Sequence, residues 1–447
     1  MSGIFRYGKG IAASLTLAAV SLGLKYAQSW VFRSVEHPDA QPGIVWVTGE
    51  SRSPQRILRN DGDCDWKIAF VTNRIASDAD LVAPGNRSLS EGGRALSDQV
   101  VDLLYAMPRT TYGAATVRVP TSRERGQFTL ESDHAARVDL TDMQEMTQQR
   151  FLSDVVGLLS QDQAADVLVF VHGFNVTLDQ AVARAAQMVE DMPFHGVVIA
   201  FSWQSVGRTD AYLADEILAE RYFWNLAELL AALRTELPES ARLHLLAHSM
   251  GNRVALRALN ALAGTIDPAG RELSEMTAHR LRNRPVDSST PFRIVSGVVD
   301  GVNEIPRRFP QWGIWTSEKL REPPLSNLIL AAPDVDCRDF GHLFGRIRHT
   351  SRRCLLYASD TDFALEASRK VHQGQFRAGD SRAKLRVEGL NLIRVSGVDS
   401  FDPLGHSYYG SNAQVLSQLA TLLNTSEFDL TRPIGSGRPV GSAPARR

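Results

Sequence analysis

The sequence predicts an α/β fold in which a mostly parallel central sheet carries helices on both faces. Short apolar runs alternate with helical stretches along residues 66–424. Most of these runs are continuously apolar, as expected for strands that are covered on both faces. Regular alternation of strands and helices implies parallel strands joined by crossover helices. With 43% hydrophobic and 22% charged residues, the composition is that of an ordinary globular protein.

The individual elements follow from the apolar pattern. The predicted strands are residues 68–71, 115–119, 167–171, 197–201, 243–246, 327–330, 354–357 and 392–395. The predicted helices are residues 178–192, 210–237, 251–263 and 362–371. A single α/β domain can reach this length, so residues 66–424 are expected to form one domain.

Residues 1–32 have the form of a secretory signal or a membrane anchor. Arg6 and Lys9 precede the uncharged run 10–24, which ends at Lys25. A basic start before such a run is typical of a signal peptide, and an uncleaved anchor is also consistent with it. We therefore expect a cell-envelope protein, either anchored in the inner membrane and facing the periplasm or secreted to the periplasm. An ordinary buried helix is the alternative.

Three further segments interrupt or flank the alternating pattern. Residues 33–65, rich in Pro, Gly, Asp and Arg, are expected to be a linker. Residues 264–325 carry seven prolines and two tryptophans and are too long for an ordinary connection. This segment is predicted to be an inserted cap over the site, and a surface excursion without function is the alternative. Residues 425–447 have few apolar side chains and are expected to be a disordered tail.

A nucleophile elbow, the sharp strand-to-helix turn that exposes a reactive serine, is predicted at Ser249. Ser249 lies between the apolar run 243–246 and the helix 251–263, with Ala247 and Gly251 two positions to either side. Small residues let the flanking backbone cross closely, and the helix N-terminus places its dipole behind a developing anion. This pattern predicts the α/β-hydrolase fold with Ser249 as the nucleophile.

The loop after the strand 167–171 is expected to complete an oxyanion hole. In this fold one backbone N–H comes from that loop and the other from the residue after the nucleophile. The predicted donors are Phe174 and Met250, and Gly173 gives the substrate access to them. His172 is expected to hold the loop through a structural hydrogen bond.

The acid and the base should follow the nucleophile in the chain order Ser, acid, His. Strand counting favours Asp362 over Asp334, with Asp360 as a close neighbour of the favoured residue. Beyond Asp362 the chain holds only His372 and His406. His406 follows the last predicted strand, in a loop that can reach over the sheet, and an imidazole has the pKa that proton transfer near neutrality needs. We therefore predict that Asp362 and His406 complete the catalytic set.

Trp203 follows the predicted strand 197–201, where loops face the site. It is predicted to line the substrate pocket together with Gly173. Packing beneath the oxyanion loop is the alternative.

Over about residues 66–423, the chain resembles a bacterial α/β-hydrolase family of unknown function that is grouped with esterase- and lipase-like enzymes. The matching residues are 70–74, 112–113, 117–120, Gly126, 172–175, 201–207, Tyr212, Asp215, 247–252, 331–334 and 405–408. The resemblance implies a Ser-Asp-His hydrolase without a cofactor, and it implies no substrate. Two features depart from the family pattern: the long insertion 264–325, and Gln204 after Trp203 where proline is expected.

The predicted reaction is hydrolysis of a carboxylic ester through an acyl-enzyme on Ser249. The expected substrate is a small-molecule ester or a lipid-like molecule. A peptidase or amidase would use the same residues, and a non-catalytic binding or scaffold protein of the envelope would use the same fold.

Other classes of function lack support in the sequence. The chain has no H-E-x-x-H motif and no complete G-x-x-x-x-G-K-[S/T] motif, so neither a metal nor a cofactor is expected. A formal net charge of -1 without a sustained Lys/Arg run argues against a nucleic-acid partner. Cys64, Cys337 and Cys354 have no zinc-site spacing and allow at most one disulfide. The oligomeric state stays open.

Overall fold

The computed structural model describes residues 53–74, 109–130, 137–161, 166–265, 312–395, 402 and 404–425. The strands are β1 (Arg56–Leu58), β2 (Cys64–Thr72), β3 (Thr111–Val119), β4 (Asp139–Met146), β5 (Asp166–Val171), β6 (Val197–Ser202), β7 (Arg242–His248), β8 (Leu325–Ala331), β9 (Ser351–Ser359) and β10 (Asn391–Val395). The helices are α3 (Gln148–Gln161), α4 (Leu178–Asp191), α5 (Tyr212–Arg221), α6 (Phe223–Glu236), α7 (Gly251–Leu262), α10 (Cys337–Ile347), α11 (Phe363–Val371), α12 (Tyr408–Ser411) and α13 (Ala413–Asn424). Single 3-10 turns are η1 (Thr209–Ala211), η2 (Arg348–Thr350) and η3 (Ser381–Ala383).

The strands form one mixed sheet in the order β10-β9-β8-β7-β5-β6-β2-β3-β4, with β1 paired to β2. Every neighbouring pair from β10 to β2 is parallel. The pairs β2–β3, β3–β4 and β1–β2 are antiparallel. The predicted mostly parallel sheet is therefore confirmed, and each predicted strand coincides with a strand of this sheet.

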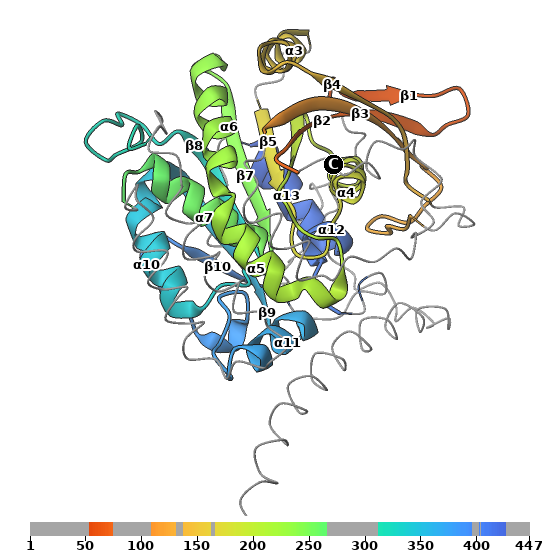
Figure 1. Ribbon diagram of the computed structural model, residues 1–447. Coiled ribbons are helices and arrows are strands. Elements are labelled where there is room, and N and C mark those ends of the chain that lie inside the picture. Colours follow the sequence, from red (N-terminus) through yellow and green to blue (C-terminus); the bar gives the residue numbers. More distant parts are fainter. Residues whose placement is uncertain are drawn as a thin grey trace, which may run out of the picture.

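Each face of the sheet packs against its own apolar core. In β5, Val167, Val169 and Val171 belong to one core, whereas Leu168 and Phe170 belong to the other. Helices α3, α5, α6, α7 and α10 cover the first face, and α4, α12 and α13 cover the second. Figure 1 shows α5, α6 and α7 in front of the strands and α12 and α13 behind them. This burial on both sides explains why the strands read as continuous apolar runs.

The central strand β7 fixes where a site can form. The strands β5, β6 and β2 lie on one side of β7, and β8, β9 and β10 are added in sequence order on the other. In open α/β sheets, ligands bind outside the carboxyl ends of the strands where the strand order changes direction. The loops that follow β5, β7, β8 and β9 meet at that position.

The folded body begins earlier than the expected start at residue 66. The Ser53 hydroxyl donates to the Gly196 carbonyl at 2.6 Å. The Gln55 side chain donates to the Val198 carbonyl at 3.1 Å and accepts from the Val198 N–H at 2.6 Å. Residues 53–65 therefore belong to the domain rather than to a linker. Hydrogen bonds between polar side chains and a neighbouring backbone leave no apolar pattern, which is why the sequence did not reveal them.

The stretch 210–237, predicted as one helix, is η1 followed by α5 and α6. The break falls at Tyr222, whose backbone φ of -101° and ψ of 24° depart from helical geometry. The Asn73 amide fills the gap, donating to the Tyr222 carbonyl at 3.3 Å and to the Asn225 side chain at 2.8 Å. A long-range side-chain contact of this kind replaces a helical hydrogen bond and cannot be read from local periodicity.

Several segments with specific predictions lie outside the described residues: 1–32, most of the expected linker, 266–311 of the insertion, and 426–447 of the tail. In the part of the chain that is described, no helix combines the length and the apolar composition that a membrane crossing requires. The two ends of the insertion are described. Trp315 is buried against the end of α7, and its N–H donates to the Leu262 carbonyl at 2.8 Å. Since α7 begins beside Ser249 and runs away from it, the insertion is attached at the opposite end of this helix.

Candidate active site

Ser249 lies in the turn between β7 and α7 with a backbone φ of 53°, in the left-handed region. Its N–H donates to the Ala331 carbonyl at 2.9 Å, which ties the turn to the end of β8. Gly251 permits the tight crossing, because a Cβ atom there would lie 2.2 Å from the His172 carbonyl oxygen. The turn therefore has the geometry expected of a nucleophile elbow.

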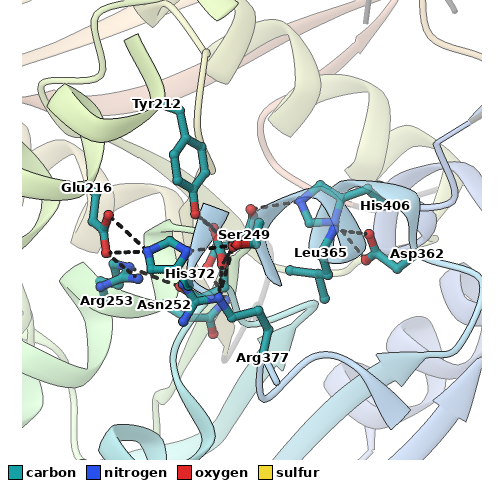
Figure 2. Close-up of polar contacts among 12 residues, drawn as sticks. Tyr212, Glu216, Ser249, Asn252, Arg253, Asp362, Leu365, His372, Arg377 and His406 are labelled. Carbon is teal, nitrogen blue, oxygen red and sulfur yellow. Dashed lines mark hydrogen bonds and ion pairs between the residues drawn. The ribbon is translucent and has the colours of Figure 1, made fainter. Parts of the chain in front are cut away.

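A hydrogen-bonded chain runs from Ser249 to Asp362 through His406. The His406 Nε2 lies 2.7 Å from the Ser249 Oγ, and its Nδ1 lies 2.8 Å from the Asp362 Oδ2. The side chain of Asp362 is 1% exposed and that of His406 is 15% exposed. Figure 2 shows these three residues in one line, with the imidazole between the hydroxyl and the carboxylate. The structure thus brings together the three residues predicted to be catalytic.

Both carboxylate oxygens of Asp362 are used, which fixes its orientation. Asp362 caps the N-terminus of α11, where its Oδ1 accepts the Leu365 N–H at 2.9 Å, leaving Oδ2 for His406. The loop that carries His406 is held in turn by His248, whose Nε2 lies 2.9 Å from the His406 carbonyl oxygen. The His248 ring also packs against Tyr409, with centroids 4.3 Å apart.

The electrostatic setting favours the protonated form of His406. Burial of the ring, the largest single influence, opposes a positive charge, but the carboxylates of Asp362, Asp402 and Asp334 together outweigh it. The pKa of His406 is therefore raised above its ordinary value of 6.5. An imidazole in this setting can accept a proton and is stabilised while it holds one.

The predicted oxyanion donors flank Ser249. Within the described residues, the backbone N–H groups of Phe174 and Met250 have no hydrogen-bond acceptor. No side chain caps the N-terminus of α7, where Met250 is the first flanking residue. The loop 172–176, which we call the oxyanion loop, approaches Ser249 closely at Gly173. A Cβ atom on Gly173 would lie 2.8 Å from the Ser249 Cβ, so only glycine fits.

Trp203 and His172 lie beneath the oxyanion loop. Trp203 is fully buried and donates from its ring nitrogen to the His172 carbonyl at 2.7 Å. The two rings stack with centroids 5.3 Å apart. Burial lowers the pKa of His172 to about 3, so this ring is neutral. The position of Trp203 matches packing under the loop, the alternative to lining a substrate pocket. That of His172 matches the structural role expected for it.

Asp334, the other candidate acid, is engaged elsewhere. Its carboxylate accepts hydrogen bonds from the hydroxyls of Tyr212 and Ser368, both at 2.6 Å, and lies 3.2 Å from the Arg377 Nε. Its backbone N–H donates to the Ser249 carbonyl at 3.2 Å. Asp334 therefore braces the elbow from the side opposite to His406 and does not contact that ring.

His372 belongs to the same buried polar cluster as Asp334. Its Nε2 lies 3.1 Å from Glu216, and Arg253 bridges Glu216 and Glu220 at 3.0 Å each. Figure 2 shows this cluster on the side of Ser249 opposite to the Asp362–His406 pair. Sequence reasoning did not identify Glu216, Arg253 or Arg377 as neighbours of the site, because each comes from a different element. Tyr212 was visible only as a residue of the family resemblance.

Metal-binding groups are not assembled in the described part of the chain, where no cluster of three or more His, Cys, Asp or Glu side chains could hold a metal ion. The side chains of Cys64, Cys337 and Cys354 are free thiols.

Comparison with known protein families identifies one that matches most of the sheet and the candidate site. Residues 147–424, more than half of the chain, match a family described as "Alpha/beta hydrolase of unknown function (DUF900)". The matched segment contains Ser249, Asp362 and His406. No curated protein matches the chain.

Proposed function

Since the chain belongs to this family of alpha/beta hydrolases, we propose that it is a serine hydrolase that cleaves carboxylic esters through an acyl-enzyme on Ser249. The observation that carries the proposal is the unbroken chain of hydrogen bonds from the Ser249 Oγ through His406 to Asp362, at 2.7 and 2.8 Å. These are distances at which a base can remove the proton of a nucleophile.

In the proposed reaction, the Ser249 Oγ attacks the ester carbonyl carbon while its proton passes to the His406 Nε2. Asp362 holds the ring through Nδ1 and stabilises the imidazolium that forms. The carbonyl oxygen becomes an oxyanion, which the N–H groups of Phe174 and Met250 bind, assisted by the dipole of α7. The alcohol leaves with the proton from His406, and a water molecule activated by the same ring then hydrolyses the acyl-enzyme.

The proposed function is tested with the Ser249→Ala variant and a fluorophosphonate probe, which labels only an activated serine. The wild-type protein should be labelled at Ser249 and should hydrolyse p-nitrophenyl esters. The variant should lose labelling completely, and its kcat should fall by up to about a millionfold. His342→Ala, a change at a histidine on α10 away from the site, serves as the control. Activity retained in Ser249→Ala would refute the assignment.

An ester series of increasing acyl length, run with matched p-nitroanilides, distinguishes esters from amides. We expect turnover of the esters and little turnover of the anilides. A preference for anilides would identify a peptidase or amidase that uses the same residues. A folded wild-type protein that neither reacts with the probe nor cleaves either series would indicate a binding or scaffold role.

A further inference from the structure

Two charged side chains from outside the oxyanion loop, those of Arg74 and Asp215, hydrogen-bond to its backbone. We call these two residues the clamp. Arg74 comes just after β2, and Asp215 lies in the first turn of α5. Neither residue contacts Ser249, His406 or Asp362 through a hydrogen bond in the described structure, so the proposed chemistry leaves both unexplained. Asp215 is fully buried and Arg74 is half-buried.

Asp215 binds the oxyanion loop and its neighbour at the same time. Its Oδ2 accepts the Asn175 N–H at 3.2 Å and the Ser205 hydroxyl at 2.5 Å. Its Oδ1 accepts the Val206 N–H at 2.6 Å. The Ser205 oxygen in turn accepts the Val176 N–H at 3.3 Å. One carboxylate thus ties the two residues after Phe174 to the loop that follows β6.

Arg74 makes the complementary set of contacts to oxygen atoms of the same two loops. Its Nη1 donates to the Ser205 carbonyl at 2.6 Å, and its Nε donates to the Ser202 hydroxyl at 2.9 Å. Its Nη2 donates to the carbonyl of Val176. The guanidinium therefore fixes the end of the oxyanion loop through a planar set of donors that a lysine cannot reproduce.

The held conformation is one that the loop would not adopt by itself. Asn175 has a backbone φ of 56°, in the left-handed region, which costs free energy for a residue other than glycine. The buried site also makes ionisation of Asp215 unfavourable, since burial raises the pKa of its carboxyl to about 6. Strained backbone and a buried carboxylate persist only where the surrounding contacts compensate for them. Here the contacts of Arg74 and Asp215 hold the peptide next to Phe174, whose N–H is the proposed oxyanion donor.

We infer that Arg74 and Asp215 are positioning residues, which together hold the oxyanion loop so that the Phe174 N–H points at the oxyanion formed on the substrate. The inference rests on the proposed function of Ser249. The clamp should therefore affect binding of the transition state and not binding of the substrate, because an oxyanion donor acts on charge that develops only during the reaction.

The test compares Asp215→Asn, which keeps side-chain size, with Arg74→Gln, which replaces the guanidinium by a shorter neutral amide; each removes one charge. We expect kcat on a p-nitrophenyl ester to fall about 10- to 100-fold, because a donor displaced by about 1 Å loses most of its effect. The KM should stay within about twofold of the wild-type value. Affinity for a trifluoromethyl ketone, which forms a tetrahedral oxyanion adduct with a serine, should fall by the same factor as kcat/KM.

The chain supplies a matched control in the same segment. Arg208 and Asp210 form an ion pair of 2.7 Å, and their side chains are 48% and 50% exposed. The variants Arg208→Gln and Asp210→Asn make the same chemical changes on the surface and should leave kcat unchanged. If a clamp variant does not fold, Ser205→Ala keeps both charges and removes only the hydroxyl bridge, and we expect kcat to fall a few-fold.

The outcomes separate the clamp from the proposed function. Wild-type labelling by a fluorophosphonate at Ser249, together with wild-type kcat in folded clamp variants, would overturn the clamp alone. A rise in KM without a fall in kcat would also overturn it, since that result indicates a substrate-binding role. If the wild-type protein is not labelled at all, both proposals are wrong.

Discussion

At the scale of single residues, backbone strain gathers around Ser249. Ser249, Asn175 and Ala332 account for three of the five non-glycine residues with positive φ in the described structure. Each such residue costs free energy on the order of 1–3 kcal/mol in an unfavourable region, and strain of this kind collects at functional sites. Ala332 follows the strand next to the elbow, and its N–H donates to the Tyr357 carbonyl at 3.0 Å. The contacts that over-determine these residues also fix the geometry of the site.

The two buried acids beside the site should respond differently to the same mutation. Asp362→Asn replaces the acceptor of the His406 Nδ1 proton, so we expect kcat/KM to fall about 10⁴-fold with little change in stability. Asp334→Asn removes the partner of the buried Arg377, 1% exposed, so it should mainly lower the free energy of unfolding, by about 3–5 kcal/mol. Ester kinetics and denaturant unfolding of both variants check this. A larger kinetic loss in Asp334→Asn would make Asp334 the acid.

The pH dependence of catalysis should report the raised pKa of His406. The ring must be neutral to accept the Ser249 proton, so kcat/KM should rise with pH as His406 loses its proton. Because the pKa is raised, the midpoint of this rise should lie above 6.5. In Asp362→Asn the carboxylate no longer attracts the protonated His406 ring, while burial of the ring still disfavours its charge. The midpoint of the pH profile of the residual kcat/KM should therefore move below 6.5. A pH profile of kcat/KM for both proteins measures it, and an unshifted midpoint in the variant would contradict the assigned cause.

At the scale of elements, the crossing of α7 over the end of β5 depends on one glycine. A Cβ atom at Gly251 would lie 2.2 Å from the His172 oxygen and 3.0 Å from the Val171 oxygen, and both are backbone atoms that cannot move alone. Gly251→Ala should therefore push the elbow away from the oxyanion loop. We expect the free energy of unfolding to fall by about 1–3 kcal/mol and kcat to fall at least about 100-fold.

The matched control for this change is Gly341→Ala, on α10. Nothing lies within 4 Å of a Cβ atom at Gly341, so alanine there should raise stability by up to about 1 kcal/mol and leave kcat unchanged. Denaturant unfolding and ester kinetics of the two variants provide the comparison. Equal behaviour of the two alanine variants would show that the crossing tolerates a side chain.

At the scale of the whole molecule, the two ends of the long insertion meet. A Cβ atom on Gly264 would lie 3.1 Å from the Gly313 Cα. The segment between them can therefore be replaced by a short Gly-Ser turn with little cost in loop closure. We expect a protein with residues 266–311 so replaced to fold and to react with a fluorophosphonate at Ser249.

The same deletion tests the predicted cap. If the insertion covers the site, its removal should broaden the range of p-nitrophenyl ester lengths that the protein hydrolyses. The full-length chain, assayed with the same series, is the reference. An unchanged length profile would mean that the segment lies away from the site, which the attachment at the far end of α7 allows.

The sequence by itself determined eight of the ten strands in the described structure and the turn at Ser249, and it predicted which acid and base follow that serine in the chain. These features are local: a buried strand shows as a continuous apolar run, and the elbow needs small residues at fixed spacing around one serine. The strands that it missed, β1 and β4, are short or polar. In β4, at the edge of the sheet, four of the eight residues are exposed and the other four are half-buried, so no continuous apolar run marks it.

Strand counting favoured Asp362 over Asp334, but only the tertiary structure decided which partners each of these carboxylates contacts. Asp334 and Asp362 both follow buried strands, and their local sequences do not distinguish them. The order β7-β8-β9 places Asp334 directly beside the elbow, where Arg377 and Tyr212 engage it, and leaves Asp362 one strand farther away, facing His406. Likewise, Arg74 and Asp215 are far apart in sequence, yet both hydrogen-bond to the oxyanion loop and to the loop that follows β6. Pairing between distant residues depends on how the elements pack, and that information is spread over the whole chain rather than carried by any one motif.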